Sequence, residues 1–176
     1  MGKSKRKKKR GGFAGKVLEV GLFILAVLLL AFILSRYVVE RVRVRNHSME
    51  HTLEEGDGVL IDKLSYRFRD PERFDIIVFK QKGSGEELIK RIIALPSETV
   101  QIVDGKILVD GEEIEDVKGL DKPEYAGIAA NPTELSVGEY FVLGDNRKES
   151  IDSRYEDVGI VTSTRIIGKM FVKLPW

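Results

Sequence analysis

The chain has 176 residues, of which 43% are hydrophobic and 32% are charged, and its formal net charge is +1. This length supports one main hydrophobic core rather than two. The absence of cysteine excludes disulfides, thiol catalysis and cysteine-based metal sites, and the two histidines, His47 and His51, leave little for a zinc site. We therefore expect no metal and no cofactor.

Positive charge is concentrated at the N-terminus, where eight lysines and arginines precede any acidic residue. They are Lys3, Lys5, Arg6, Lys7, Lys8, Lys9, Arg10 and Lys16. The remainder of the chain is therefore net acidic. A basic block can bind nucleic acid, but the apolar segment that follows favours a membrane. We predict that residues 1–15 form a basic cytoplasmic tail and that nucleic acid is not a partner.

The next segment is apolar from Val17 to Leu34 except for Glu19. About 20 helical residues span the hydrocarbon core of a bilayer, so residues 16–38 are predicted to form a transmembrane anchor. A buried core helix is disfavoured because the segment has no amphipathic stripe. A cleaved signal peptide is disfavoured because bulky residues occupy positions 34–40, where a cleavage site needs small ones.

The distribution of lysine and arginine predicts the orientation of this anchor. The eight charges before it outnumber the four arginines that follow, which are Arg36, Arg41, Arg43 and Arg45. Because positive charge stays inside, the N-terminus is placed in the cytoplasm and residues 39–176 outside. The chain is thus predicted to be a single-pass protein of the cell membrane, with the lipid bilayer as a partner.

Residues 39–176 are predicted to be mainly β. Short runs that are rich in β-branched residues and bounded by glycine, proline or aspartate predict antiparallel strands. These runs lie at 38–44, 58–61, 75–80, 88–95, 99–103, 106–109, 139–143 and 166–172. The pairs Asp104-Gly105 and Asp110-Gly111 predict tight turns, and residues 49–54 are expected to form a single turn.

The expected architecture is a folded-over antiparallel sheet or a small barrel-like domain. Residues 112–138 contain Pro123, Pro132 and several glycines and show weak periodicity, so they predict a long connection or a small subdomain. Together with the hairpin before them, residues from about 100 to 138 are predicted to form an inserted subdomain.

The segment from Gly144 to Arg154 combines charged, amide and hydroxyl groups with almost no apolar side chain. The strand at 139–143 leads into it, and Gly144-Asp145-Asn146 is a turn signal. Polar groups at a strand end are commonly functional. The simpler alternative is a solvated loop of mixed charge.

A serine hydroxyl becomes a nucleophile only with a base within hydrogen-bond reach, and three side chains are candidates for Ser48. His47 is adjacent and points to the opposite face of an extended chain. His51 approaches Ser48 only if the chain turns there. Lys90 lies on the strand at 88–95, and a lysine becomes a base when burial lowers its pKa from about 10.4. The strand by itself favours a lysine that reaches solvent from an edge.

Four segments in this order resemble the sequence boxes of the type I signal peptidases, membrane-bound serine proteases that use a lysine as base. They are Ser48 to Leu53, Arg73 to Phe79, Lys90 to Pro96 and Gly144 to Arg154. The chain departs from the family pattern at three positions: His51 replaces the usual proline, and Phe74 and Ser97 replace usual glycines. These are turn or backbone-setting positions, so the departures concern local geometry rather than chemistry.

The resemblance implies roles for the residues at the centre of the site. Ser48 is expected to be the nucleophile and Lys90 the general base. Ser150 is expected to hydrogen-bond Lys90 and aim it at Ser48. Asn46 stands where some members have an oxyanion-hole hydroxyl, and its amide N–H is a candidate donor beside the backbone N–H of Ser48. An ordinary strand-end asparagine is the alternative.

The resemblance also implies supporting roles for the remainder of the polar segment. Asp152 and Arg154 are expected to form an ion pair that keeps the segment in shape. Asp145 and Arg147 are expected to stabilise the turn rather than to contact substrate.

The activity that the resemblance implies is that of a serine endopeptidase that cleaves signal peptides from exported preproteins at alanine-x-alanine type sites. The substrate is expected to add as an extended strand to an edge of the sheet, at residues 39–44 or at the strand after Arg73. The self-cleaving repressors of the bacterial DNA-damage response share the serine-lysine pair, but they carry a DNA-binding domain where this chain has an anchor. The alternative function is a catalytically inactive membrane-anchored β-domain that binds exported proteins, against which Ser48 and Lys90 both argue.

Overall fold

The computed structural model describes residues 13–174, so the predicted basic tail lies outside the described residues except for its last three. Helix α1 spans Phe13–Tyr37 and is 25 residues long. At 1.5 Å per residue its length is about 37 Å, which exceeds the roughly 30 Å hydrocarbon core of a bilayer. Within it, residues 15–33 have a mean hydropathy of 2.5, and none of that window is buried against protein. An apolar helix whose side chains are exposed suits a lipid environment.

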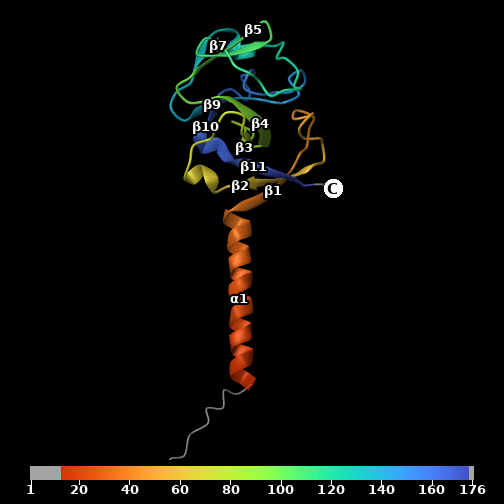
Figure 1. The fold of residues 1–176 in the computed structure, drawn as a ribbon, viewed down its shortest axis with the longest axis vertical. Coiled ribbons are helices and arrows are strands. Elements are labelled where there is room, and N and C mark those ends of the chain that lie inside the picture. The colour runs from red at the N-terminus through yellow and green to blue at the C-terminus, as the bar shows by residue number, and fades with distance from the viewer. Residues whose placement is uncertain (1–12, 175–176) are drawn as a thin grey trace, which may run out of the picture. The chain divides into compact units, whose positions relative to one another are not determined.

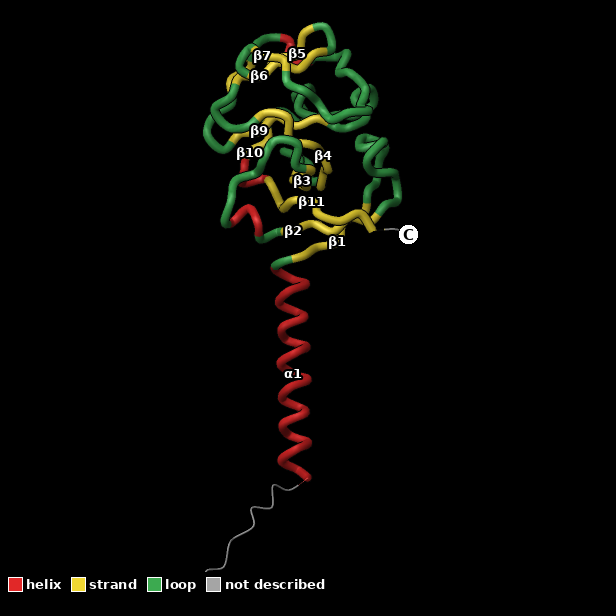
Figure 2. Tube along the Cα trace, in the orientation of Figure 1, coloured by secondary structure: helices red, strands yellow, loops and turns green. Residues whose placement is uncertain are grey.

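The chain after the helix forms its own compact unit, residues 38–176, whose main sheet has seven strands, all paired antiparallel. Figures 1 and 2 show these strands. Their bounds are β1 Val39–Arg43, β2 Gly58–Asp62, β3 Ile76–Lys80, β4 Glu87–Ala94, β9 Glu139–Leu143, β10 Val161–Thr162 and β11 Ile166–Leu174. The predicted antiparallel β fold is therefore confirmed. Their order, β1-β2-β11-β3-β4-β9-β10, places β1 and β10 at the edges.

Strand β3 lies inside the sheet, hydrogen-bonded to β11 on one side and β4 on the other. The expectation that the strand after Arg73 offers a free edge to a substrate is therefore wrong. The run Ile76 to Phe79 is continuously apolar because both of its faces are buried: Val78 packs in one core cluster, and Ile77 and Phe79 pack in another. Only β1 of the two proposed strands is an edge.

A second, smaller sheet follows β4 in the chain and has the order β7-β6-β5-β8. Its strands are β5 Thr99–Val103, β6 Lys106–Val109, β7 Glu112–Glu113 and β8 Thr133–Glu134. The predicted turns are present, since Asp104, Gly105, Asp110 and Gly111 all have positive φ, as two-residue hairpin turns require. In Figures 1 and 2 this sheet lies on the β9 side of the domain, away from β1 and β2.

The small sheet shares a hydrophobic core with the end of the main sheet. Val100, Ile102 and Ile107 pack in one cluster with Ile93 of β4 and Phe141 of β9. Because this cluster joins the two sheets, residues 99–134 are held against the strands that carry Lys90 and lead into the 144–154 segment. The small sheet is thus positioned to influence the site.

Some short elements have no counterpart in the sequence prediction. They are the two-residue strands β7, β8 and β10 and the 3₁₀ helices η1 Ser65–Arg67, η2 Gly127–Ala130 and η3 Ser163–Arg165. Two to four residues are too few to show a periodicity, so only tertiary contacts define these elements.

Candidate active site

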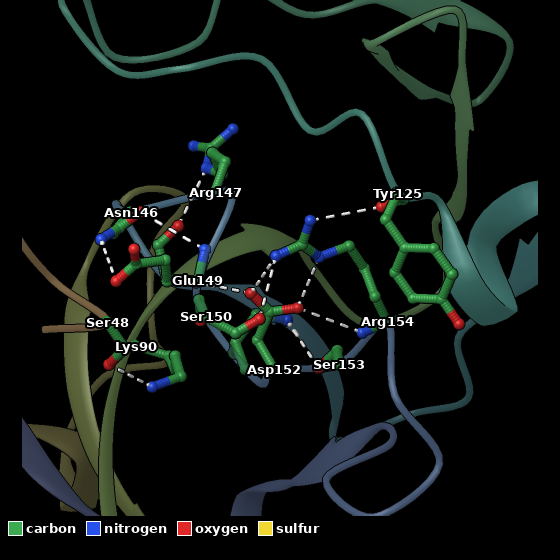
Figure 3. Close-up of polar contacts among 12 residues, drawn as sticks. Ser48, Lys90, Tyr125, Asn146, Arg147, Glu149, Ser150, Asp152, Ser153 and Arg154 are labelled. Carbon is green, nitrogen blue, oxygen red and sulfur yellow. Dashed lines mark hydrogen bonds and ion pairs between the residues drawn. The ribbon is translucent and has the colours of Figure 1, made fainter. Parts of the chain in front are cut away.

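The structure brings Ser48 and Lys90 together at the centre of the domain. The Lys90 Nζ atom donates to Ser48 Oγ across 2.7 Å and also to the carbonyl oxygen of Ile89 at 3.0 Å. Both side chains are buried, Lys90 to 1% exposure and Ser48 to 8%. Figure 3 shows the two side chains meeting from separate parts of the chain. The solvent-reaching alternative for Lys90 is therefore wrong.

The turn that presents Ser48 is fixed by its own hydrogen bonds and by two buried side chains. The backbone N–H groups of Thr52 and Leu53 both donate to the carbonyl oxygen of Met49, which closes the single turn expected here. Met49 and Leu53 are almost fully buried in the core between β2 and β4. Ser48 therefore sits on a rigid turn rather than on a free loop.

Burial changes the acid-base chemistry of Lys90. Desolvation is the largest effect and lowers the pKa of Lys90 from 10.5 to about 8. The carboxylates of Asp152 and Asp145 oppose this fall in pKa, and the guanidinium of Arg154 adds to it. A lysine with this pKa is neutral in a substantial fraction of molecules near pH 8, so it can accept a proton.

Asn46 contacts the nucleophile through its amide oxygen. Its Oδ1 atom accepts hydrogen bonds from Ser48 Oγ at 2.7 Å and from the backbone N–H of Ser48 at 3.2 Å. The sequence offers the amide N–H of Asn46 as a candidate donor beside the backbone N–H of Ser48, with an ordinary strand-end asparagine as the alternative. In the structure, both donors of Ser48 instead point to the Asn46 oxygen.

Ser150 is buried close to the site, but the expected hydrogen bond to Lys90 is absent. Among the described residues its Oγ atom has no hydrogen-bond partner. It packs against Gly144, where a Cβ atom would lie 2.1 Å from Ser150 Oγ and 2.4 Å from the carbonyl oxygen of Ser48. Gly144 therefore allows the polar segment to approach the nucleophile more closely than any other residue would.

The expected ion pair between Asp152 and Arg154 is present and fully buried. Arg154 donates from Nε to Oδ1 at 2.7 Å and from Nη2 to Oδ2 at 2.8 Å, and Asp152 also accepts the backbone N–H of Gly144 at 3.0 Å. The same guanidinium donates to the carbonyl oxygens of Ser150 and Tyr125, both at 3.2 Å. Figure 3 shows Arg154 at the centre of this network. A paired fork of this kind fixes the backbone on both sides of Ser150.

Asp145 and Arg147 do more than stabilise their own turn. Asp145 accepts hydrogen bonds from Nε and Nη2 of Arg91 at 2.8 and 2.6 Å and from the hydroxyl of Thr52 at 2.5 Å. It therefore links the turn that presents Ser48, strand β4 and the polar segment. Arg147 binds the carboxylate of Asp116, a residue of the small sheet's long loop. Nothing in the local sequence pattern marks Asp116 for this contact, so it was not among the predicted site residues.

Neither histidine is placed to deprotonate Ser48. His47 pairs with Glu50 and with Glu55, the latter at 3.2 Å, and the hydrogen bond to Glu50 raises the pKa of His47. His51 is exposed, and within residues 13–174 no hydrogen bond joins it to Ser48.

The three departures from the family pattern all have left-handed backbone. The φ angles are +81° at His51, +69° at Phe74 and +69° at Ser97. Glycine adopts this region without strain, which accounts for glycine as the usual residue at the last two positions. Proline, with φ fixed near −65°, cannot adopt the angle seen at His51, so the backbone of this turn as it stands excludes proline at position 51.

One cleft is lined by the pair, and a second cleft shares Asn46 and Glu86 with it. One, of 380 Å³, is lined by Ser48 and Lys90 with Leu88, Ile151 and Val158 among its apolar walls. The other, of 520 Å³, lies between residues 41–46, at and beyond the edge strand β1, and residues 85–89. In the described part of the chain no group of three or more histidine and acidic side chains is placed to hold a metal ion.

A buried lysine amine within hydrogen-bond reach of a serine hydroxyl, on an antiparallel sheet with an open cleft, defines a candidate serine hydrolase of the serine-lysine type. The family model described as signal peptidase, peptidase S26, matches residues 17–176. The chain therefore belongs to the signal peptidase family and is a serine endopeptidase, and the resemblance noted in its sequence is confirmed.

Individual relatives agree with this assignment. The chain is similar to a probable signal peptidase I-2 of Synechocystis sp., with 35% identity over 95% of this chain and 77% of that protein. It is 37% identical to a signal peptidase I of Leptolyngbya laminosa over 82% of this chain and 72% of the relative. It is also 35% identical to signal peptidase I V of Bacillus subtilis, over 92% and 96% of the two chains. Family membership and the apolar helix together indicate a membrane-anchored enzyme.

Proposed function

We propose that this chain removes signal peptides from exported preproteins at small-x-small sites, with Ser48 as nucleophile and Lys90 as general base. The observation that carries the proposal is the 2.7 Å contact between a buried lysine amine and the serine hydroxyl. The lowered pKa of Lys90 supports the same assignment, because only a neutral amine accepts the serine proton.

The reaction begins when neutral Lys90 takes the proton of Ser48 as its Oγ attacks the carbonyl carbon of the scissile bond. The tetrahedral intermediate collapses as the lysine ammonium gives this proton to the departing amine, which leaves an ester between Ser48 and the signal peptide. Lys90, neutral again, then takes a proton from water, whose oxygen attacks the ester. Collapse of this second intermediate returns the proton to Ser48 and releases the signal peptide as a carboxylic acid.

The oxyanion of the tetrahedral intermediate needs hydrogen-bond donors. In the free enzyme the backbone N–H of Ser48, one candidate donor, is bound to the amide oxygen of Asn46. The backbone N–H of Ser48 becomes available once the substrate carbonyl oxygen displaces the Asn46 oxygen from it. A rotation of the Asn46 amide by about 180° then presents its N–H₂ group in place of the oxygen, as an oxyanion hole of one backbone and one side-chain donor requires. Asn46 is thus proposed to serve the intermediate rather than the resting enzyme.

Ser150, Asp152 and Arg154 are proposed to support the pair rather than to react. The fork between Asp152 and Arg154 keeps the backbone around Ser150 in place. The Ser150 hydroxyl, without a hydrogen-bond partner in the described structure, is a donor that a change of its rotamer can turn toward the amine.

The substrate is proposed to bind as an extended strand in the 520 Å³ cleft along residues 41–46. Val42, Val44 and Ile89 line this cleft, and Asn46 leads from it to the nucleophile. Charged residues share the lining with these side chains, so the apolar part of the cleft is limited and suits the small side chains before a signal-peptide junction. No free edge exists at β3, so β1 and its extension carry this role.

We expect the purified full-length protein in detergent micelles to cleave a preprotein that has an alanine-x-alanine junction. Mass spectrometry of the product should give the mature N-terminus directly after the second alanine. A matched preprotein with phenylalanine in place of that alanine should stay intact, because the proposed specificity is for a small side chain at that position. Cleavage of both preproteins, or of neither, would contradict the proposed specificity.

In the proposed orientation, residues 39–176 lie on the outer side of the cell membrane and the basic tail lies inside. Signal peptides of exported preproteins and the lipid bilayer are the proposed partners. Protease added to intact spheroplasts should therefore digest the catalytic domain while a tag fused before Gly2 survives. Lysed spheroplasts are the control, in which both parts should be digested. A tag lost from intact spheroplasts together with a protected C-terminus would show the opposite topology.

A further inference from the structure

The loop between β7 and β8 is fastened to the polar segment by a buried charge. Asp116 binds Arg147 through both carboxylate oxygens, and the Nη2–Oδ1 distance is 3.0 Å. The Arg147 side chain is fully buried, whereas that of Asp116 is 25% exposed. A buried guanidinium without its carboxylate is strongly unfavourable, so Asp116 fixes the place of Arg147.

The same loop contacts the polar segment a second time at Arg154. The carbonyl oxygen of Tyr125 accepts from Arg154 Nη1, and the backbone N–H of Ile128 donates to the Arg154 carbonyl oxygen at 3.0 Å. Between them, Gly127 has a φ of +55°, and a Cβ atom there would lie 2.0 Å from that carbonyl oxygen. The loop is therefore joined to the segment at both buried arginines, by a side chain at Arg147 and by its backbone at Arg154.

Arg147 connects Asp116 with the nucleophile in two further steps. Its Nε donates to the carbonyl oxygen of Gly144 at 3.0 Å. Gly144 is wedged between Ser150 and the Ser48 carbonyl oxygen, and that same oxygen accepts the backbone N–H of Asn146 at 3.1 Å. A shift of Arg147 is thus transmitted to the backbone that lies against Ser48.

We propose that Asp116 is a positioning residue of the catalytic site: through Arg147 it holds the turn at residues 144–150 against Ser48 and over Lys90. The loop between β7 and β8, rather than the strands of the small sheet, then supports the catalytic site. This inference rests on the proposed serine-lysine mechanism.

The charged groups around Lys90 predict how its pKa should respond to the loss of Asp116. Asp145, Asp152 and Arg154 act on Lys90 through their charges, and all three lie on the segment that Asp116 fastens. The amine itself touches Ser48 Oγ and the Ile89 carbonyl oxygen. If the turn loosens, water reaches Lys90, and its pKa moves from about 8 back toward 10.5.

The test compares Asp116→Asn with Glu113→Gln, which removes a carboxylate from the exposed pair of Glu113 with Lys106 on the same small sheet. We expect Asp116→Asn to lower kcat by about 10- to 100-fold, as a displacement of about 1 Å at a reacting group does. KM should change little, and the acid limb of the pH–rate profile should shift to higher pH. Asp116→Glu should restore much of kcat and of the position of the acid limb, and Glu113→Gln should match the wild type.

Two further measurements separate positioning from general stabilisation. The double variant Asp116→Asn with Arg147→Met should be no slower than Arg147→Met alone, because both act through one contact. Hydrogen exchange of the amides at 144–150 should accelerate in Asp116→Asn but not in Glu113→Gln.

Unchanged kcat, acid limb and hydrogen exchange in Asp116→Asn would overturn the inference, as would a lower melting temperature with catalysis unchanged. A failure of the proposed serine-lysine mechanism would give a different result: a variant without the Lys90 amine, such as Lys90→Met, would still cleave the preprotein. In that case, unchanged hydrogen exchange in Asp116→Asn still overturns the positioning role, and faster exchange still supports it.

Discussion

Purified Ser48→Ala and Lys90→Met proteins are each expected to cleave the preprotein at least about 10⁴-fold more slowly than the wild type, because each lacks one half of a nucleophile that works only as a pair. The double variant should be no slower than either single variant. Single-turnover cleavage of the preprotein measures the loss. Substantial cleavage by either variant would reject the pairing of Ser48 with Lys90.

The stability of Lys90→Met provides the control against misfolding. Burial holds the pKa of Lys90 near 8 in the folded protein, against 10.5 for an exposed lysine. Folding therefore becomes more favourable as pH rises from about 8 to 10.5, and below pH 8 the buried ammonium costs up to about 3 kcal/mol. Methionine has no such charge, so Lys90→Met should unfold at a higher temperature than the wild type at pH 7. An inactive variant that is also less stable would leave misfolding as the cause.

Most strands could be predicted because each is long enough to show its pattern. The runs at 99–103, 106–109 and 139–143 match β5, β6 and β9. The position of a strand within the sheet could not be predicted in this way, because it depends on contacts between residues far apart in sequence. That is why β3 was a candidate edge in the sequence and is an interior strand in the structure, between β11 and β4.

The candidate site was predictable where residue type alone limits the chemistry. A chain without cysteine and with two poorly placed histidines leaves few bases for Ser48, and the family pattern selects Lys90. Side-chain direction was not predictable. The Asn46 oxygen, rather than its N–H₂ group, faces Ser48, and Ser150 packs against Gly144 without reaching Lys90. Both depend on rotamers that only the packed structure determines.

The contacts of the loop between β7 and β8 could not be predicted from the sequence, for a further reason. Asp116 pairs with a residue 31 positions away, in a loop with weak periodicity. A single carboxylate in such a loop is usually solvated. Only the fold shows that it faces a buried guanidinium.

The pH dependence of kcat/KM is the second large effect expected, because a lysine base and a histidine base differ in it. If Lys90 must be neutral in the free enzyme, kcat/KM should rise tenfold per pH unit up to a plateau above about pH 8. At pH 6 the rate constant should then be about one hundredth of the plateau value. Steady-state cleavage of a fluorogenic signal-peptide substrate between pH 5.5 and 10 measures this limb.

Variants at position 90 and at the histidines decide which group produces the limb. Lys90→Arg should be inactive at every pH in this range, because a guanidinium stays protonated throughout and cannot take the proton of Ser48. His47→Ala and His51→Ala should keep both the plateau and the midpoint near pH 8, since neither ring is placed to reach Ser48. A midpoint near 6.5 that disappears in His51→Ala would assign the base to histidine. An active Lys90→Arg enzyme would show that position 90 supplies positive charge rather than basicity. The mechanism would then have to be replaced by one in which another group takes the proton of Ser48.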